Sequence, residues 1–116
     1  MSLLDTTQIA LETAMRGSML RQTLLTNNLA NVDTPGFQRQ DVDFQGTLRA
    51  ALDAGQVPDQ VSFKPVTQQQ TTRADGNGVD AEQESANVAE NALLYQELAQ
   101  IATAREQILQ SAMGTR

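Results

Sequence analysis

Apolar and polar positions divide the chain into two long helical segments separated by a middle of different character. From residue 5 to residue 31, apolar side chains recur at spacings of three, four and seven, which predicts one long amphipathic helix. Asp5 or Thr6 can cap its start, and Gln8 lies where a capping-box partner of Asp5 would stand. The apolar stripe is broader than the seam of a single coiled coil.

The second long helix is predicted from Ala81 to about Met113, a stretch without proline or glycine. Asp80 is the expected N-cap, and Glu82 and Glu84 place negative charge in the first turn, where the helix dipole favours it. The glutamates along this helix are expected to face solvent. Two neighbouring apolar tracks predict two contact surfaces: Val88, Ala92, Tyr95, Ala99, Ala102, Leu109, Met113, and Leu94, Leu98, Ile101, Ile108, Ala112.

These lengths predict a rod rather than a globule. Helices of about 40 and about 50 Å would overhang a compact domain of this size, which is only about 30 Å across. We therefore expect a mainly α fold in which the two terminal helices form an antiparallel, coiled-coil-like hairpin. The expected parts are residues 1–33, the N-terminal long helix; 34–79, a turn, short helix and extended arm; and 80–116, the C-terminal long helix.

Two helices alone would leave much of their apolar surface in water, and large exposed apolar stripes usually mark partner surfaces. The predicted assembly face consists of Leu24, Leu25, Val88, Leu94, Tyr95, Leu98, Ile101, Ile108 and Leu109. With three Phe, one Tyr and no Trp, the chain also has few large rings with which to build a core of its own. We expect an isolated monomer of modest stability.

The middle segment lacks the long helical period. Residues 41–44 alternate and indicate a short extended piece, whereas residues 44–55 predict a short amphipathic helix ended by Gly55. Residues 56–78 hold two prolines and a polar run, so we expect an irregular, mobile extended arm.

The stretch "NNLANVDTPGF", residues 27–37, ends the first helix. Asn31 is a good helix C-cap, Pro35 fixes φ, and Gly36 can take the positive φ that a type II turn requires. A helix stop followed by a turn explains these residues. The adjacent Asn27 and Asn28 exceed what a stop requires, and their amides can tie the helix end to the turning chain or to a neighbour.

Charge and composition exclude several function classes. The net charge is −6 and the cations are scattered, so neither nucleic acid nor an anionic membrane surface is an expected partner. Without Cys or His, the usual zinc sites and nucleophile–histidine pairs cannot form. A calcium loop starting at Asp75 fails at its fifth, sixth and twelfth positions. We expect no enzyme, no cofactor and no metal, and neither a cleavable signal peptide nor a bilayer-spanning segment.

Two motifs resemble one protein family. "NNLANVDTPGFQRQ" closely resembles the signature of bacterial flagellar rod and hook proteins, carried here by Asn27, Asn28, Leu29, Ala30, Asn31, Thr34, Pro35, Gly36 and Phe37. "DGNGVDAEQESANVAENALLYQELAQ", residues 75–100, resembles the C-terminal region of FlgB-type proximal rod proteins. One departure is Gln38, where a basic residue often follows the aromatic; Arg39 stands one place later, which puts a partner-facing charge there in doubt.

The resemblance implies a structural subunit of the proximal rod, which polymerises helically into the drive shaft that carries torque from the membrane ring to the hook. It implies that the chain leaves the cytoplasm unfolded through the flagellar type III export apparatus, and resides in the rod spanning the periplasm. Expected partners are further copies of the chain, other rod proteins, adaptors between membrane ring and rod, and the export apparatus. Phe44 and Leu48 fit the Phe-x-x-x-apolar pattern of an export-gate motif. The alternative is a soluble helical adaptor or export-chaperone-like binding module.

Overall fold

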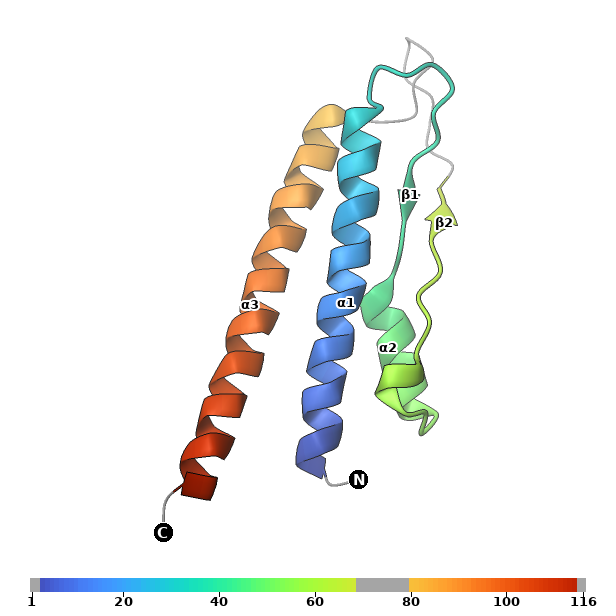
Figure 1. Cartoon of the computed structure of the whole chain (residues 1–116). Helices are drawn as coiled ribbons and strands as arrows, with labels where there is room; N and C mark the ends of the chain where they lie inside the picture. The colour runs from blue at the N-terminus through green and yellow to red at the C-terminus, as the bar shows by residue number, and fades with distance from the viewer. Residues whose placement is uncertain (1–2, 69–79, 115–116) are drawn as a thin grey trace.

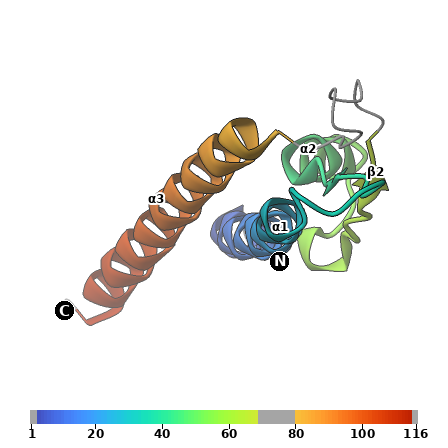
Figure 2. The same cartoon turned by 90° about the horizontal axis from the view of Figure 1, so that it is seen from above.

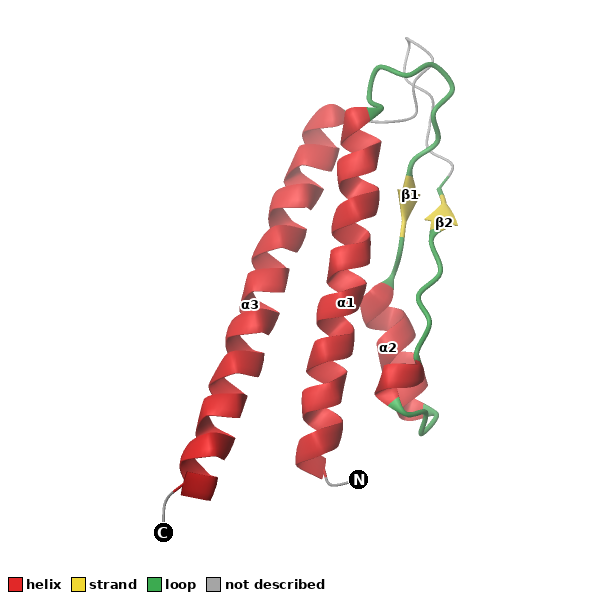
Figure 3. Cartoon of the chain, in the orientation of Figure 1, coloured by secondary structure: helices red, strands yellow, loops and turns green. Residues whose placement is uncertain are grey.

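The computed structural model describes residues 3–68 and 80–114 and is dominated by helices (Figure 3). Two long helices, α1 and α3, flank a middle that holds a short helix, a single 3-10 turn and two short strands (Figure 1). In chain order these are α1 (Leu3–Ala30), β1 (Gln40–Asp41), α2 (Phe44–Asp53), η1 (Pro58–Gln60), β2 (Val66–Thr67) and α3 (Ala81–Gly114). The predicted fold class is confirmed.

The molecule is a rod with extents of 66 × 27 × 14 Å and a radius of gyration of 17.8 Å. A compact chain of this length would have a radius of gyration of about 13 Å. Helices α1 and α3 run antiparallel beside each other, so that both chain ends lie at the same end of the rod (Figure 1). The excess length follows from two uninterrupted helices of 28 and 34 residues.

Helix α1 lies between two different neighbours. Seen along its axis, α3 lies on one side, and α2 with the extended segments lies on the other (Figure 2). Among the helices and strands of the described part, α3 packs against α1 alone, whereas α1 also contacts α2, η1 and β1. Within the described part, α1 is therefore the only helix or strand that packs against both sides.

Local chemistry explains most helix ends. Helix α2 is capped by Asp43, whose side chain accepts a hydrogen bond from the Gly46 N–H. It ends in a Schellman motif, because Gly55 has φ +78° and the Gln56 N–H donates to the Ala51 carbonyl at 2.9 Å. Asp80 caps α3, accepting from the Glu82 N–H at 3.0 Å. The predicted Gly55 stop and Asp80 cap are confirmed; the "DGNG" turn before α3 and the calcium-loop start at Asp75 lie outside the described residues.

The start of α1 differs from the prediction. The helix begins by Leu3, so Asp5 lies inside its first turn and neither Asp5 nor Thr6 is the N-cap. A carboxylate within the first turn is favoured by the same dipole that favours a cap, which is why the sequence pattern did not separate the two positions.

The apolar core lies between α1 and the middle segment. Leu48, Ala51 and Val61 form its buried cluster, and Ala14 of α1 and Phe63 pack against it. Phe44 is 2% exposed and meets Phe63 edge to face, with ring centroids 6.4 Å apart. Helix α1 admits this ring only because residue 17 is glycine: a Cβ there would lie 2.6 Å from the Cβ of Phe44.

The middle segment is more regular than predicted. Strand β1 pairs antiparallel with β2, with Gln40 opposite Thr67 and Asp41 opposite Val66. The extended piece therefore starts before residue 41, and Phe44 already belongs to α2. Within residues 56–68, η1 and β2 form, and Val61 is 3% exposed, which corrects the expectation of a wholly irregular arm. The physical reason is that Val61 and Phe63 find an apolar partner in α1 and α2. Residues 69–78 of the predicted arm lie outside the described residues.

Candidate assembly surface and its polar junction

The "NNLANVDTPGF" stretch forms the predicted stop and turn. After α1 ends, the Asn31 side chain donates to the Asn27 carbonyl at 2.8 Å, and the Thr34 hydroxyl donates to the Asn31 side chain at 3.1 Å. The Phe37 N–H donates to the Thr34 carbonyl, and Gly36 has φ +75°, as a type II turn requires. Thr34, Pro35 and Gly36 are exposed, so the tip of this turn is accessible.

The two adjacent asparagines have different environments. Asn28 is fully buried and binds the backbone of Gln40 twice: its amide donates to the carbonyl at 2.8 Å, and its Oδ1 accepts from the N–H at 3.0 Å. A side chain thus satisfies the inner edge of β1 as a neighbouring strand would. Asn27 is exposed. The predicted tie from helix end to turning chain is made by Asn28.

Arg39 lies at the centre of a buried polar junction. It is 4% exposed, and its guanidinium binds both oxygens of Glu84 on α3, the side chain of Gln68, and Asp41 at 3.4 Å. Arg21 of α1 binds both carboxylate oxygens of Asp41, at 2.8 and 3.3 Å. The junction joins α1, β1 and α3 through alternating charges. Glu84 is 1% exposed, which corrects the prediction that it faces solvent.

Folding favours the charged forms of Arg39 and Asp41. Burial raises the pKa of Asp41, but the hydrogen bond from Arg21, the Val42 N–H and the charges of both arginines outweigh it, so this pKa lies below its ordinary value. Burial lowers the pKa of Arg39, yet the hydrogen bond and charge of Glu84, with Asp41, hold it above its ordinary value. Arg39 is thus an internal charge of the subunit and does not face a partner.

The predicted assembly face divides by burial. Leu24 and Leu25 are 9% and 0% exposed, so they belong to the subunit's own interior. Val88, Leu94, Tyr95, Leu98 and Leu109 are half-buried on α3. Ile101 and Ile108 are 49% and 67% exposed, and Leu93, which the two tracks omitted, is 57% exposed. At 3.6 residues per turn, Leu93, Ile101 and Ile108 lie within about 80° of arc, and we call them the outer stripe of α3.

Phe44 and Leu48 of α2 are 2% and 9% exposed, and both pack in the apolar contact between α1 and the middle segment. The folded chain therefore conceals both side chains of the predicted export-gate motif.

Within the described residues, His, Cys, Asp and Glu side chains form no cluster of three or more suited to a metal ion. The described helices include none of the length and hydropathy needed to cross a membrane.

Comparison with known proteins identifies the family. The family described as flagella basal body rod protein matches residues 10–38, which contain most of α1 and the turn after it. A flagellar basal body rod protein FlgB of Yersinia enterocolitica is 35% identical over 98 residues, covering 66% of this chain and 70% of that protein. The FlgB of Bacillus subtilis is 32% identical over 110 residues, covering 84% of this chain and 85% of that protein. The chain belongs to the FlgB family of flagellar basal body rod proteins.

Membership of the FlgB family places the chain in the basal body as a structural rod protein that associates with other basal-body components. FlgB of Escherichia coli K12, 32% identical over 96 residues, covering 66% of this chain and 70% of that protein, agrees. The relatives are structural rod proteins rather than enzymes. The match over residues 10–38 includes the Asn27–Phe37 motif, from which the family resemblance was inferred.

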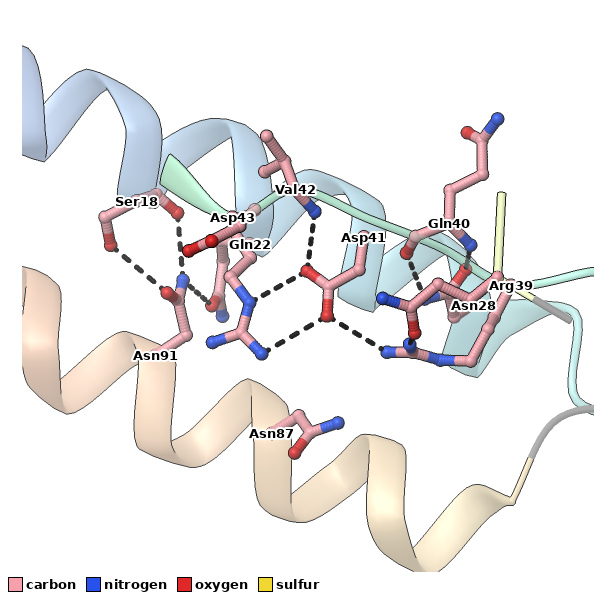
Figure 4. A network of polar contacts seen from close by, with 12 residues as sticks. Ser18, Gln22, Asn28, Arg39, Gln40, Asp41, Val42, Asp43, Asn87 and Asn91 are labelled. Carbon is pink, nitrogen blue, oxygen red and sulfur yellow. Dashed lines mark hydrogen bonds and ion pairs between the residues drawn. The ribbon is translucent and has the colours of Figure 1, made fainter. Parts of the chain in front are cut away.

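Sequence reasoning missed the buried polar residues between the two long helices of this FlgB-family chain. Ser18 and Asn91 are buried between α1 and α3, and Asn91 binds both the Ser18 carbonyl and the Gln22 side chain (Figure 4). One signal was available. Glu84, Asn91 and Leu98 are spaced by seven, so a polar residue twice occupies a position that faces the partner helix.

Proposed function

We propose that the chain is a subunit of the proximal rod that polymerises helically through the outer stripe of α3. The rod it builds transmits torque from the membrane ring to the hook. One observation carries the proposal: Leu93, Ile101 and Ile108 of α3 are each about half exposed or more. A row of large aliphatic side chains on a surface helix is stabilised when a neighbour covers it.

The mechanism of such a subunit is mechanical. Long helices packed side by side distribute load over many contacts. The buried junction of Arg39, Asp41 and Glu84 would transfer force between α3 and the middle segment, because its partners come from different elements. The exposed tip of the Thr34–Phe37 turn is proposed as a further contact with neighbouring rod subunits or ring adaptors.

A charge in the outer stripe tests this proposal. Ile101→Glu is to be introduced in flagellated cells that lack the unaltered copy, with Gln100→Glu, an exposed neighbour on the same helix, as the matched control. We expect Ile101→Glu to abolish swimming while the helicity and melting of the purified chain stay unchanged, because the side chain is half exposed in the free subunit. Gln100→Glu should swim normally. Normal swimming of the Ile101→Glu strain would refute the stripe as an assembly face.

We propose further that the chain is exported unfolded by the flagellar type III apparatus, without a cleaved signal, and that Phe44 and Leu48 dock at the export gate. Their burial supports an unfolded substrate, since the gate could reach both side chains only before the chain folds.

The export proposal requires a control for stability. Phe44→Ala with Leu48→Ala removes the motif but also opens the core. Val61→Ala opens the same core and leaves the motif intact. We expect secretion to fall for the double variant and to remain normal for Val61→Ala. Undiminished secretion of the double variant would contradict the docking role, and an equal loss in both variants would show that stability, not the motif, governs export.

A further inference from the structure

The contact between α1 and α3 has a polar layer at its centre. The Asn91 amide donates to the Ser18 carbonyl at 2.9 Å and to the Gln22 side chain at 2.8 Å, and the Ser18 hydroxyl donates to the Asn91 Oδ1 at 3.4 Å. Ser18 and Asn91 are 0% and 1% exposed. Water cannot replace these partners, so each polar group depends on the opposite helix.

Heptad spacing locates the layers on either side. In antiparallel helices, residues stay level when one number rises by seven and the other falls by seven. Leu25 and Glu84 are thus level beyond Ser18 and Asn91, and both are fully buried. Leu11 and Leu98 are level in the other direction, and both are half-buried. The layers alternate between one that holds a buried carboxylate, one that holds amides and one that is aliphatic.

Sliding α3 along α1 by one heptad would have unequal effects on these layers. Leucines and alanines would meet other apolar or small side chains. Asn91 would instead lie level with Leu11 or Leu25 and lose its acceptors, and Glu84 would leave Arg39, which the middle segment holds through Asp41 and Gln68. A buried polar group without a partner disfavours the slipped pairing by on the order of tenfold or more.

We propose that Asn91 with Ser18, and Glu84 with Arg39, are the two register pins of the hairpin, fixing the axial position of α3 on α1. The aliphatic residues of the seam hold the helices together without choosing a register. The pins therefore also set the axial position of the outer stripe relative to α1. This inference concerns the single chain and stands independently of the proposed function.

Engineered cysteine pairs can measure the register, because the chain has no cysteine of its own. Leu11→Cys with Leu98→Cys reports the observed register, and Leu11→Cys with Arg105→Cys reports a slip of one heptad.

Each pair is placed in the full chain with intact pins, with Asn91→Leu, and with the triple change Arg39→Met, Glu84→Met and Asn91→Leu. Asn87→Leu is the matched control, since Asn87 bonds to Gln83 within α3. After mild oxidation, mass spectrometry of linked peptides from monomeric species gives the cross-linked fraction.

With intact pins and with Asn87→Leu, the observed-register pair should cross-link and the slipped pair should not. In the triple variant the slipped fraction should rise by at least about tenfold while helicity is kept, because apolar replacements of a buried ion pair are usually tolerated. A slipped fraction unchanged from the intact chain would overturn the proposal. If the triple variant fails to fold, Asn91→Leu alone decides: a rise in the slipped fraction supports the pins, and no rise overturns them.

Discussion

Helix α1 packs a cluster of aliphatic and aromatic side chains against the middle segment, whereas its contact with α3 contains three fully buried polar side chains. Phe44, Leu48 and Val61 fill the first contact. The five largest fully buried side chains in the described part all lie on α1 or α3, and four of them are polar. Three of these, Ser18, Glu84 and Asn91, belong to the contact between the two long helices, whereas the fourth, Asn28, binds Gln40. The contact with the middle segment mainly contributes apolar burial, whereas the polar groups in the contact with α3 specify how the two helices align.

The difference teaches how a thin rod can be both stable and specific. Apolar burial contributes free energy in proportion to area but is indifferent to sliding. Hydrogen bonds between buried groups contribute little net stability, yet they strongly penalise misplacement. The chain assigns these tasks to opposite sides of one helix, and α3 also carries exposed aliphatic side chains.

The largest loss of stability should come from substitutions in the apolar contact between α1 and the middle segment. Phe44→Ala should lower the free energy of unfolding by about 3 to 5 kcal/mol, because it empties a fully buried ring site. Leu98→Ala, a half-buried site facing α1, should cost about 1 to 2 kcal/mol. Urea unfolding followed by circular dichroism measures both, and equal losses would contradict the division of tasks.

The paired asparagines give a sharper, intermediate test. Asn28→Ala should cost about 1 to 3 kcal/mol, since the carbonyl and N–H of Gln40 both lose a partner. Asn27→Ala, at an exposed site one residue earlier, should change stability by less than about 0.5 kcal/mol. The same urea experiment applies. A large loss for Asn27→Ala would mean that the exposed amide has a structural role in the free chain.

The smallest effect concerns pH. A carboxylate whose pKa is lowered by folding contributes stability that is complete above its unfolded pKa of about 3.9 and is lost as pH falls through the folded value. Asp41→Asn should therefore be less stable than the unaltered chain at pH 7. The free energies of unfolding of the two chains, measured against pH, should converge below about pH 4. The exposed Asp53→Asn controls for charge alone. If the difference in free energy of unfolding between Asp41→Asn and the unaltered chain stayed constant with pH, ionised Asp41 would not be the source of the lost stability.

Much of the frame could be predicted from sequence. Both long helices, the type II turn at Pro35 and Gly36, the Asp80 cap and the Gly55 stop depend on local chemistry, and the structure confirms them. The family too was recognisable, because the Asn27–Phe37 motif is contiguous in the chain.

What sequence did not reveal depends on contacts between distant segments. Glu84 has the pattern of a solvated first-turn acid until Arg39 is brought beside it by the turn and β1. Gly17 resembles a tolerated weakness in a helix until Phe44 is found packed against it. Leu24 and Leu25 have the same apolar character as Ile101 and Ile108, and periodicity cannot tell which of them another part of the same chain will cover.

Between the end of α1 at Ala30 and the start of α3 at Ala81, the chain completes its whole middle segment. Helix α1, α2 and the described part of the arm are contiguous and contact one another, so they can assemble over short loops. Helix α3 must close a long loop to reach α1, and non-local contacts of that kind form slowly. We therefore expect α3 to dock last, which gives the folding chain an interval in which the face of α1 that contacts α3 is still uncovered.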